Sequence, residues 1–92
     1  MVATGELFAG RYLLGTPVVS PAFLDAFEAL DQTLNRPVVV SIVTERFSSN
    51  REFVSTFSAR MRSAMGLVHA SIAQTFDVGT DIISGRAYVV TE

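Results

Sequence analysis

The chain has 92 residues, enough for one small domain covering residues 1–92. Hydrophobic residues make up 49% of it and charged residues 17%, which predicts a folded domain rather than a disordered segment. The net charge is -2 without any basic cluster, which argues against nucleic-acid binding through phosphate contacts. All seven basic residues are arginine and cysteine is absent, so neither lysine nor thiolate chemistry is available.

The hydrophobic residues do not gather into a membrane-spanning segment. No stretch approaches the roughly 18 consecutive apolar residues that a span needs. Residues 1–6 also lack the basic flank and apolar run of a signal peptide. The sequence therefore predicts a cytoplasmic location without membrane contact by this segment, either in a cytosolic protein or in the cytosolic part of a membrane protein.

The first half of the chain alternates between strand and turn signals. We expect residues 1–9 to form a flexible lead-in, followed by an apolar strand at residues 11–19. Residues 22–30 fit a strand or a short helix by pattern, and their Ala, Leu and Glu content favours helix. Residues 31–36 indicate a turn, and the largely β-branched residues 38–43 give the clearest strand.

The clearest helix begins near residue 49. Ser49 and Glu52 have the spacing of a capping box. After them, six apolar residues recur at intervals of three and four and form one stripe: Phe53, Phe57, Met61, Ala64, Met65 and Val68. The stripe should face the sheet, above Val38, Val40 and Ile42 or above the residues that alternate with them.

Two short strands close the chain, at residues 72–78 and 87–91, with turn residues between them. If residues 22–30 form a strand, the element order gives a five-stranded antiparallel sheet with one long helix on a face. The predicted fold class is therefore α+β.

Motifs in six segments carry a joint resemblance to a known family. They are "RYLL" at residues 11–14, the Asp31 that ends the second strand, "LNRPVVVSIV" at 34–43, the helix and turn residues Phe53, Phe57, Leu67, Val68 and His69 with Ile72 after them, "FDVG" at 76–79 and "GRAYVVTE" at 85–92. Over residues 10–92 these segments resemble the amino-terminal lobe of a bacterial, actinobacterial-like serine/threonine protein kinase. The resemblance implies that lobe's sheet and helix, and it makes residues 22–30 the second strand.

The resemblance also implies which positions would hold ATP. A glycine-rich loop brings bare backbone against the phosphates, and its glycine positions hold Val19, Pro21 and Leu24 here, with Ala26 at the valine position that follows. Side chains at Val19 and Leu24 would block close approach, and Pro21 has no N–H to donate. We therefore expect that this loop cannot cradle a phosphate in the usual way.

The charged pair of the same site is replaced as well. By resemblance, Ser41 occupies the lysine position, Arg60 the helix glutamate position, and Thr91 a nucleotide-binding position at the hinge. For Ser41 we favour a hydrogen bond to backbone over a ligand contact. For Arg60 we favour an ion pair with Asp25 or Asp77 over binding of an external anion. The "HRD" and "DFG" motifs are absent, so we expect no enzyme activity, no cofactor and no metal site.

Three functions follow from these observations. The first is a non-catalytic, pseudokinase-type module that acts in protein–protein interaction or regulation as part of a larger signalling protein. The alternative is a residual nucleotide-binding lobe that still accepts ATP, and the third is half of a working kinase. For the partner we expect another protein or a homodimer, formed near residues 88–91 or through the helix side, because the composition is rich in apolar residues.

Overall fold

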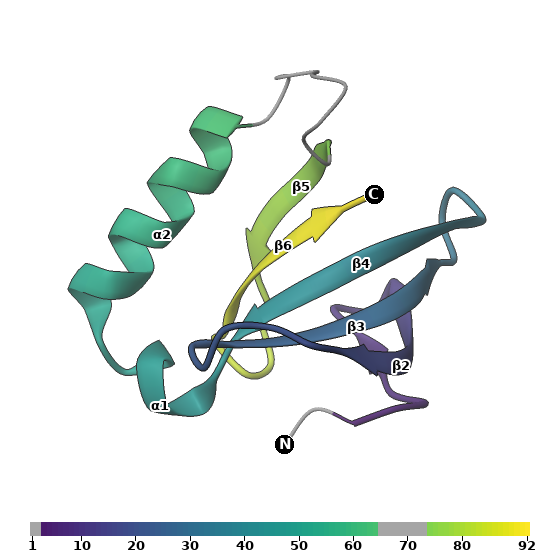
Figure 1. Ribbon diagram of the computed structural model, residues 1–92, viewed down its shortest axis with the longest axis horizontal. Helices are drawn as coiled ribbons and strands as arrows, with labels where there is room; N and C mark the ends of the chain where they lie inside the picture. The colour runs from purple at the N-terminus through teal and green to yellow at the C-terminus, as the bar shows by residue number, and fades with distance from the viewer. Residues whose placement is uncertain (1–2, 65–73) are drawn as a thin grey trace.

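The chain folds into one antiparallel sheet with a long helix beside it (Figure 1). The computed structural model describes residues 3–64 and 74–92. Its elements are, in chain order, β1 (Leu7–Phe8), β2 (Tyr12–Val18), β3 (Leu24–Asp31), β4 (Arg36–Val43), α1 (Glu45–Ser48), α2 (Arg51–Ala64), β5 (Thr75–Thr80) and β6 (Ala87–Thr91). The strands lie in the order β1-β2-β3-β4-β6-β5, and each neighbouring pair is antiparallel. This is the predicted α+β fold, with the five expected strands and one additional short strand.

The two faces of the sheet bury different sets of residues, as β4 shows. Val38, Val40 and Ile42 pack with aromatic residues of β2 and β6 on one face. Val43 packs with Phe57 of α2 on the other face. Successive side chains of a strand point to opposite faces, so the residues beneath the helix are those that alternate with Val38, Val40 and Ile42. The sequence had left this choice open.

The helix α2 packs on the sheet through the predicted apolar stripe. Phe53, Phe57 and Met61 all join the hydrophobic cluster between α2 and the sheet, and Phe57 is only 8% exposed. The predicted capping residue is wrong by one position. The side-chain oxygen of Asn50 accepts the N–H of Phe53 at 3.0 Å, so Asn50 rather than Ser49 caps the helix.

A short helix, α1, precedes α2, and the sequence does not predict it. Its Phe47 ring lies 5.2 Å from that of Phe53, so α1 extends the apolar surface of α2. Neither of the two described helices is long and apolar enough to cross a membrane. Several predicted helix and turn residues have side chains outside the described residues: Ala64, Met65, Leu67, Val68, His69 and Ile72.

The strand β3 confirms the assignment that the resemblance gave to residues 22–30, against their helical propensity. All eight residues of β3 pair with β4, and β2 pairs with it on the other side. Phe27 and Ala29 are buried on one face of the sheet. Hydrogen bonds on both sides and burial of alternate residues outweigh a propensity difference of a few tenths of a kcal/mol per residue.

The amino-terminal segment differs from the predicted flexible lead-in. Leu7 and Phe8 pair with Leu13 and Tyr12 of β2 and form an edge strand. Phe8 is 2% exposed, and its ring meets the ring of Tyr88 edge-on at 5.2 Å between centroids. A two-residue strand is too short to show a periodic pattern, so the sequence gives no sign of it.

The strand β6 lies inside the sheet, between β4 and β5. Tyr88 and Val90 are 9% and 1% exposed. Tyr88 and Val90 pack with Phe8 and Tyr12 in the core of the chain, so these two side chains are not exposed for self-association, and association itself stays a prediction. The edge strands are β1 and β5.

Candidate functional site

The sequence-predicted site centres on the face of β3, β4 and β6 that α2 flanks. Ser41 in β4 pairs with Ala26 of β3 on one side and with Val89 of β6 on the other. Ala26 is buried and Ser41 is half-buried. The hydroxyl of Ser41 makes no hydrogen bond within the described residues, so the predicted bond to backbone is not formed. The site therefore presents a neutral hydroxyl where the resemblance places an ammonium group.

The turn between β2 and β3 carries two of the three positions that align with glycines, Val19 and Pro21, and the third, Leu24, begins β3. Val19 is fully exposed, and Pro21 has no N–H. The N–H of Leu24 donates to the carbonyl of Pro21 at 3.0 Å, and the hydroxyl of Ser20 donates to the carbonyl of Leu24 at 3.0 Å. Two of the three aligned positions thus have no backbone donor left for a phosphate.

A residue that the sequence analysis passed over, Phe23, anchors this turn. Its ring lies 5.5 Å from the ring of Phe53 on α2 and 6.4 Å from that of Phe47 on α1. Its carbonyl accepts the N–H of Thr44 at 3.0 Å. The sequence assigned Phe23 to the segment 22–30, with Phe27 four residues after it, and no local pattern indicated that its ring would contact the helices. The turn is consequently held against both helices.

Arg60 lies exposed on α2 and lines an apolar pocket beside β6. The predicted ion pair of Arg60 is wrong. Asp25 pairs with Arg86 at 2.8 Å instead, and Asp77 accepts the hydroxyl of Tyr12 at 3.3 Å. Among the described residues Arg60 makes no ion pair, so its guanidinium is available to an external group.

Arg86 is a second residue that sequence reasoning missed. It is 5% exposed and donates from Nε to the carbonyl of Val43 at 2.7 Å. Its Nη2 donates to the carboxylate of Asp25 at 2.8 Å. Arg86 therefore joins β3 to the segment before β6 and to the end of β4, and its burial indicates a structural role.

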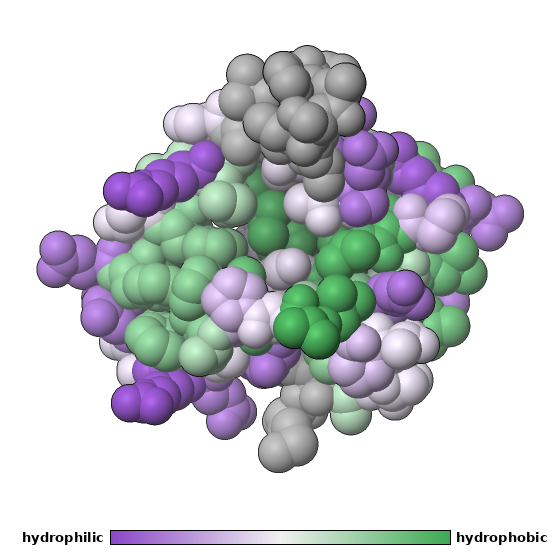
Figure 2. All heavy atoms as spheres, in the orientation of Figure 1, coloured by the Kyte–Doolittle hydropathy of each residue, from purple (hydrophilic) through white to green (hydrophobic). Residues whose placement is uncertain are grey.

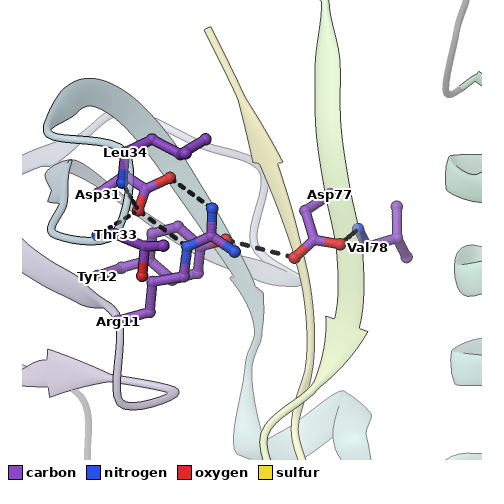
Figure 3. Close-up of polar contacts among 7 residues, drawn as sticks. All are labelled: Arg11, Tyr12, Asp31, Thr33, Leu34, Asp77 and Val78. Atoms are coloured by element: carbon purple, nitrogen blue, oxygen red, sulfur yellow. Dashed lines mark hydrogen bonds and ion pairs between the residues drawn. The ribbon is translucent and has the colours of Figure 1, made fainter.

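At the far end of the sheet, Arg11 and Asp31 form a bidentate ion pair (Figure 3). Both hydrogen bonds measure 2.8 Å, and Asp31 is 1% exposed. The same carboxylate accepts the N–H groups of Thr33 and Leu34 at 3.0 and 3.2 Å, which closes the predicted turn. The hydrogen bonds from Arg11 lower the pKa of Asp31 to about 2, and the same pair raises the pKa of Arg11.

Tyr12 extends this network toward β5, since its hydroxyl points at Asp77 in Figure 3. Burial raises the pKa of Tyr12 to about 12. Asp77 also accepts the N–H of Val78 at 2.9 Å. These polar groups satisfy one another, so the network fastens strands together and does not resemble an active site.

The last predicted site residue, Thr91, is half-buried in β6 and pairs with Val39 and Thr75. Because Thr91 lies two residues from Val89, it shares the sheet face of Ser41. The structure thus gathers Ser41 and Thr91 on one face, with Leu24 and Arg60 lining the pocket beside it. Within residues 3–64 and 74–92, no cluster of three metal-ligating side chains occurs.

Solved structures identify this architecture. The kinase domain of Mycobacterium tuberculosis PknI superposes on the whole chain with a TM-score of 0.80 at 18% identity, and the match covers 36% of that domain. The apo form of PpkA-294 gives a TM-score of 0.81 at 15% identity over all of this chain and 38% of the other. The fold is that of a kinase amino-terminal lobe.

Sequence comparison agrees with the structural match. The chain is 34% identical over 91 residues to the serine/threonine-protein kinase PknA of Mycobacterium tuberculosis, which covers 96% of this chain and 21% of PknA. A probable serine/threonine-protein kinase of Clostridium acetobutylicum is 29% identical over 88 residues, 13% of its length. No family model matches the chain. The chain is thus homologous to PknA and spans about a fifth of its length.

Proposed function

We propose that this kinase-like lobe is a non-catalytic, pseudokinase-type module that acts in protein–protein interaction or regulation within a larger signalling protein. The observation that carries the proposal is the joint replacement of the phosphate ligands. Ser41 stands at the lysine position and Arg60 at the glutamate position, while the turn that aligns with the glycine loop is held by Phe23. Phosphoryl transfer depends on positioning and on charge at these points.

The electrostatics of the sheet face support the same proposal. Ser41 contributes no charge, and the chain has no lysine that could substitute for one. Glu28 is exposed on β3, two residues from Ala26, and so adds a carboxylate to this face. This carboxylate repels a nucleoside triphosphate and so opposes its binding.

One observation favours the alternative, a residual nucleotide-binding lobe. Arg60 is exposed beside the site and forms no ion pair within the described residues. A guanidinium binds phosphate well, so Arg60 could hold a nucleotide in a way that differs from the lysine of the relatives. A direct binding measurement separates the two functions.

Calorimetric titration with ATP and magnesium tests the proposal. We expect the wild-type chain to bind ATP no tighter than about 1 mM. Ser41→Lys combined with Arg60→Glu restores the charged pair at its two positions and should bind ATP weakly but measurably. Ser41→Lys combined with Arg62→Glu is the matched control, because Arg62 is exposed on the same helix away from the pocket. A micromolar dissociation constant for the wild type would favour the residual nucleotide-binding function instead.

We further propose that the partner is a protein, including a second copy of this chain. Leu7, Leu13 and Leu30 are 47%, 37% and 38% exposed and pair in register across β1, β2 and β3 on the α2-side face of the sheet. An exposed apolar row of this kind favours association. Light scattering over a concentration series should show more than a monomer at tens of micromolar, and Leu13→Ser with Leu30→Ser should reduce it. A wild-type chain that stays monomeric would contradict self-association.

A further inference from the structure

We propose that the apolar pocket between α2 and the β2–β3 turn binds a small aromatic carboxylate, with Arg60 as its anion-binding group. The pocket has a volume of about 320 Å³. Its apolar walls are Phe23 and Leu24 from the turn, Phe53, Phe57 and Met61 from α2, and Val89 from β6. Figure 2 shows hydrophobic side chains gathered over α2 and across the middle of this view, with hydrophilic ones toward the margins.

The walls suit a flat aromatic ring. The rings of Phe53 and Phe57 are nearly parallel, with 6.2 Å between centroids and an interplanar angle of 17°. Phe23 meets Phe53 edge-on at 5.5 Å and 71°. A ligand ring can therefore pack offset against one phenylalanine and edge-on to another, the two geometries that aromatic pairs prefer. The volume lies at the lower end of the range for small-molecule pockets, roughly 300–1,000 Å³, so the ligand is compact.

The polar groups of the pocket select for an anion. Arg60 and the Thr56 side chain are its polar lining residues, and no carboxylate lines it. Because Arg60 forms no ion pair within the described part of the chain, its guanidinium can donate two hydrogen bonds to a carboxylate in a bidentate geometry. Four other pockets among the described residues differ, since each has an acidic residue in its lining. An anionic ligand should therefore bind in this pocket rather than in the four that contain acidic residues.

The pocket shares Leu24 and Arg60 with the positions that the resemblance assigns to the nucleotide site, but the proposed ligand does not require nucleotide binding. It needs neither a lysine nor a metal ion, and it contacts Phe57 and Val89, which form the boundary between α2 and the sheet. A ligand in this position touches α2, the turn and β6 together. Occupancy should therefore stabilise the folded chain by an amount that rises with the logarithm of ligand concentration above the dissociation constant.

Calorimetric titration of the folded chain with naphthalene-2-carboxylate tests the inference, with 2-naphthylmethanol and 2-naphthylmethylammonium as neutral and cationic analogues. We expect the carboxylate to bind most tightly and the cation most weakly. Arg60→Gln should weaken carboxylate binding about three- to tenfold, because a solvent-screened charge-assisted contact is lost. The neutral analogue should bind both proteins equally.

Arg62→Gln is the matched control, because it removes the same charge from an exposed position of the same helix outside the pocket. It should leave the affinity within about twofold of the wild type. Circular dichroism confirms that both variants fold. The inference would be overturned if the two variants weakened carboxylate binding equally, or if the carboxylate and the ammonium analogue bound with equal affinity. It would also be overturned if none of the three naphthyl compounds gave a heat of binding. The ATP titration uses a different ligand, so this inference and the proposed function can fail separately.

Discussion

The ion pair between Arg11 and Asp31 should make the stability of this lobe depend on pH in the acid range. Asp31 is almost fully buried and receives two 2.8 Å hydrogen bonds from the guanidinium. Lowering its pKa from 3.8 to about 2 corresponds to roughly 2.5 kcal/mol of folding free energy at neutral pH. The side chain of Arg11 is 33% exposed, so solvent screening reduces this to about 2 kcal/mol.

The direction of the pH dependence follows from the lowered pKa. Between about pH 4 and pH 2 the unfolded chain binds a proton at Asp31 that the folded chain does not, so falling pH favours unfolding. This contribution is present in full above about pH 5 and is lost below about pH 2. Asp31→Asn should destabilise the chain by about 2–4 kcal/mol at pH 6, because Arg11 loses its charged partner. The difference from wild type should shrink by about 2 kcal/mol at pH 2.

Urea unfolding at pH 6, 4 and 2, followed by circular dichroism, measures these differences. Gln32→Ala changes an exposed residue of the same turn and should stay within about 0.5 kcal/mol of wild type at each pH. A double-mutant cycle with Arg11→Gln should return a coupling energy of about 1–3 kcal/mol. If wild type and Asp31→Asn differ equally at pH 6 and pH 2, the ion pair does not set the pKa of Asp31 and the reasoning fails.

Two further predictions concern packing. Phe57→Ala should lower the free energy of unfolding by about 3–5 kcal/mol, because it opens a cavity between α2 and the sheet. Ser55→Ala changes an exposed position of the same helix and is the control. It should change the free energy of unfolding by less than about 0.5 kcal/mol in the same urea titration. Gly79→Ala should lower the free energy of unfolding by about 1–3 kcal/mol, because the added Cβ would lie 2.8 Å from the hydroxyl oxygen of Tyr88. An unchanged melting temperature would show that the ring of Tyr88 can move aside.

The elements that the sequence predicts are those whose own residues show a strand propensity or a helical spacing. Residues 38–43 are largely β-branched, and α2 carries a stripe with helical spacing, so both elements are evident from the chain alone. Residues 22–30 are different, because their propensity favours helix and only pairing with β2 and β4 makes them a strand. For residues 22–30, the spacing of the kinase-like motifs indicated a strand, whereas propensity favoured a helix.

The parts that the sequence does not predict depend on contacts between distant positions. Arg86 meets Asp25 across 61 residues, and no pattern near either residue indicates the pair. The predicted ion pair of Arg60 failed for the same reason, since charge and position on a helix do not say which carboxylate comes within reach. Phe8 was missed because a two-residue strand has no period to detect.

The β2–β3 turn shows why Ser41→Lys and Arg60→Glu alone should not restore full affinity for ATP. To meet a phosphate, this turn would have to release the Leu24 N–H from Pro21 and separate the Phe23 ring from the rings of α1 and α2. A lysine at position 41 would supply charge but no backbone donor, and Pro21 would still lack an N–H. The Ser41→Lys and Arg60→Glu variant should therefore remain well below the affinity of a lobe with a glycine-rich loop. A variant that also replaces Val19, Pro21 and Leu24 by glycine should bind ATP more tightly, because it frees the turn and supplies the missing N–H.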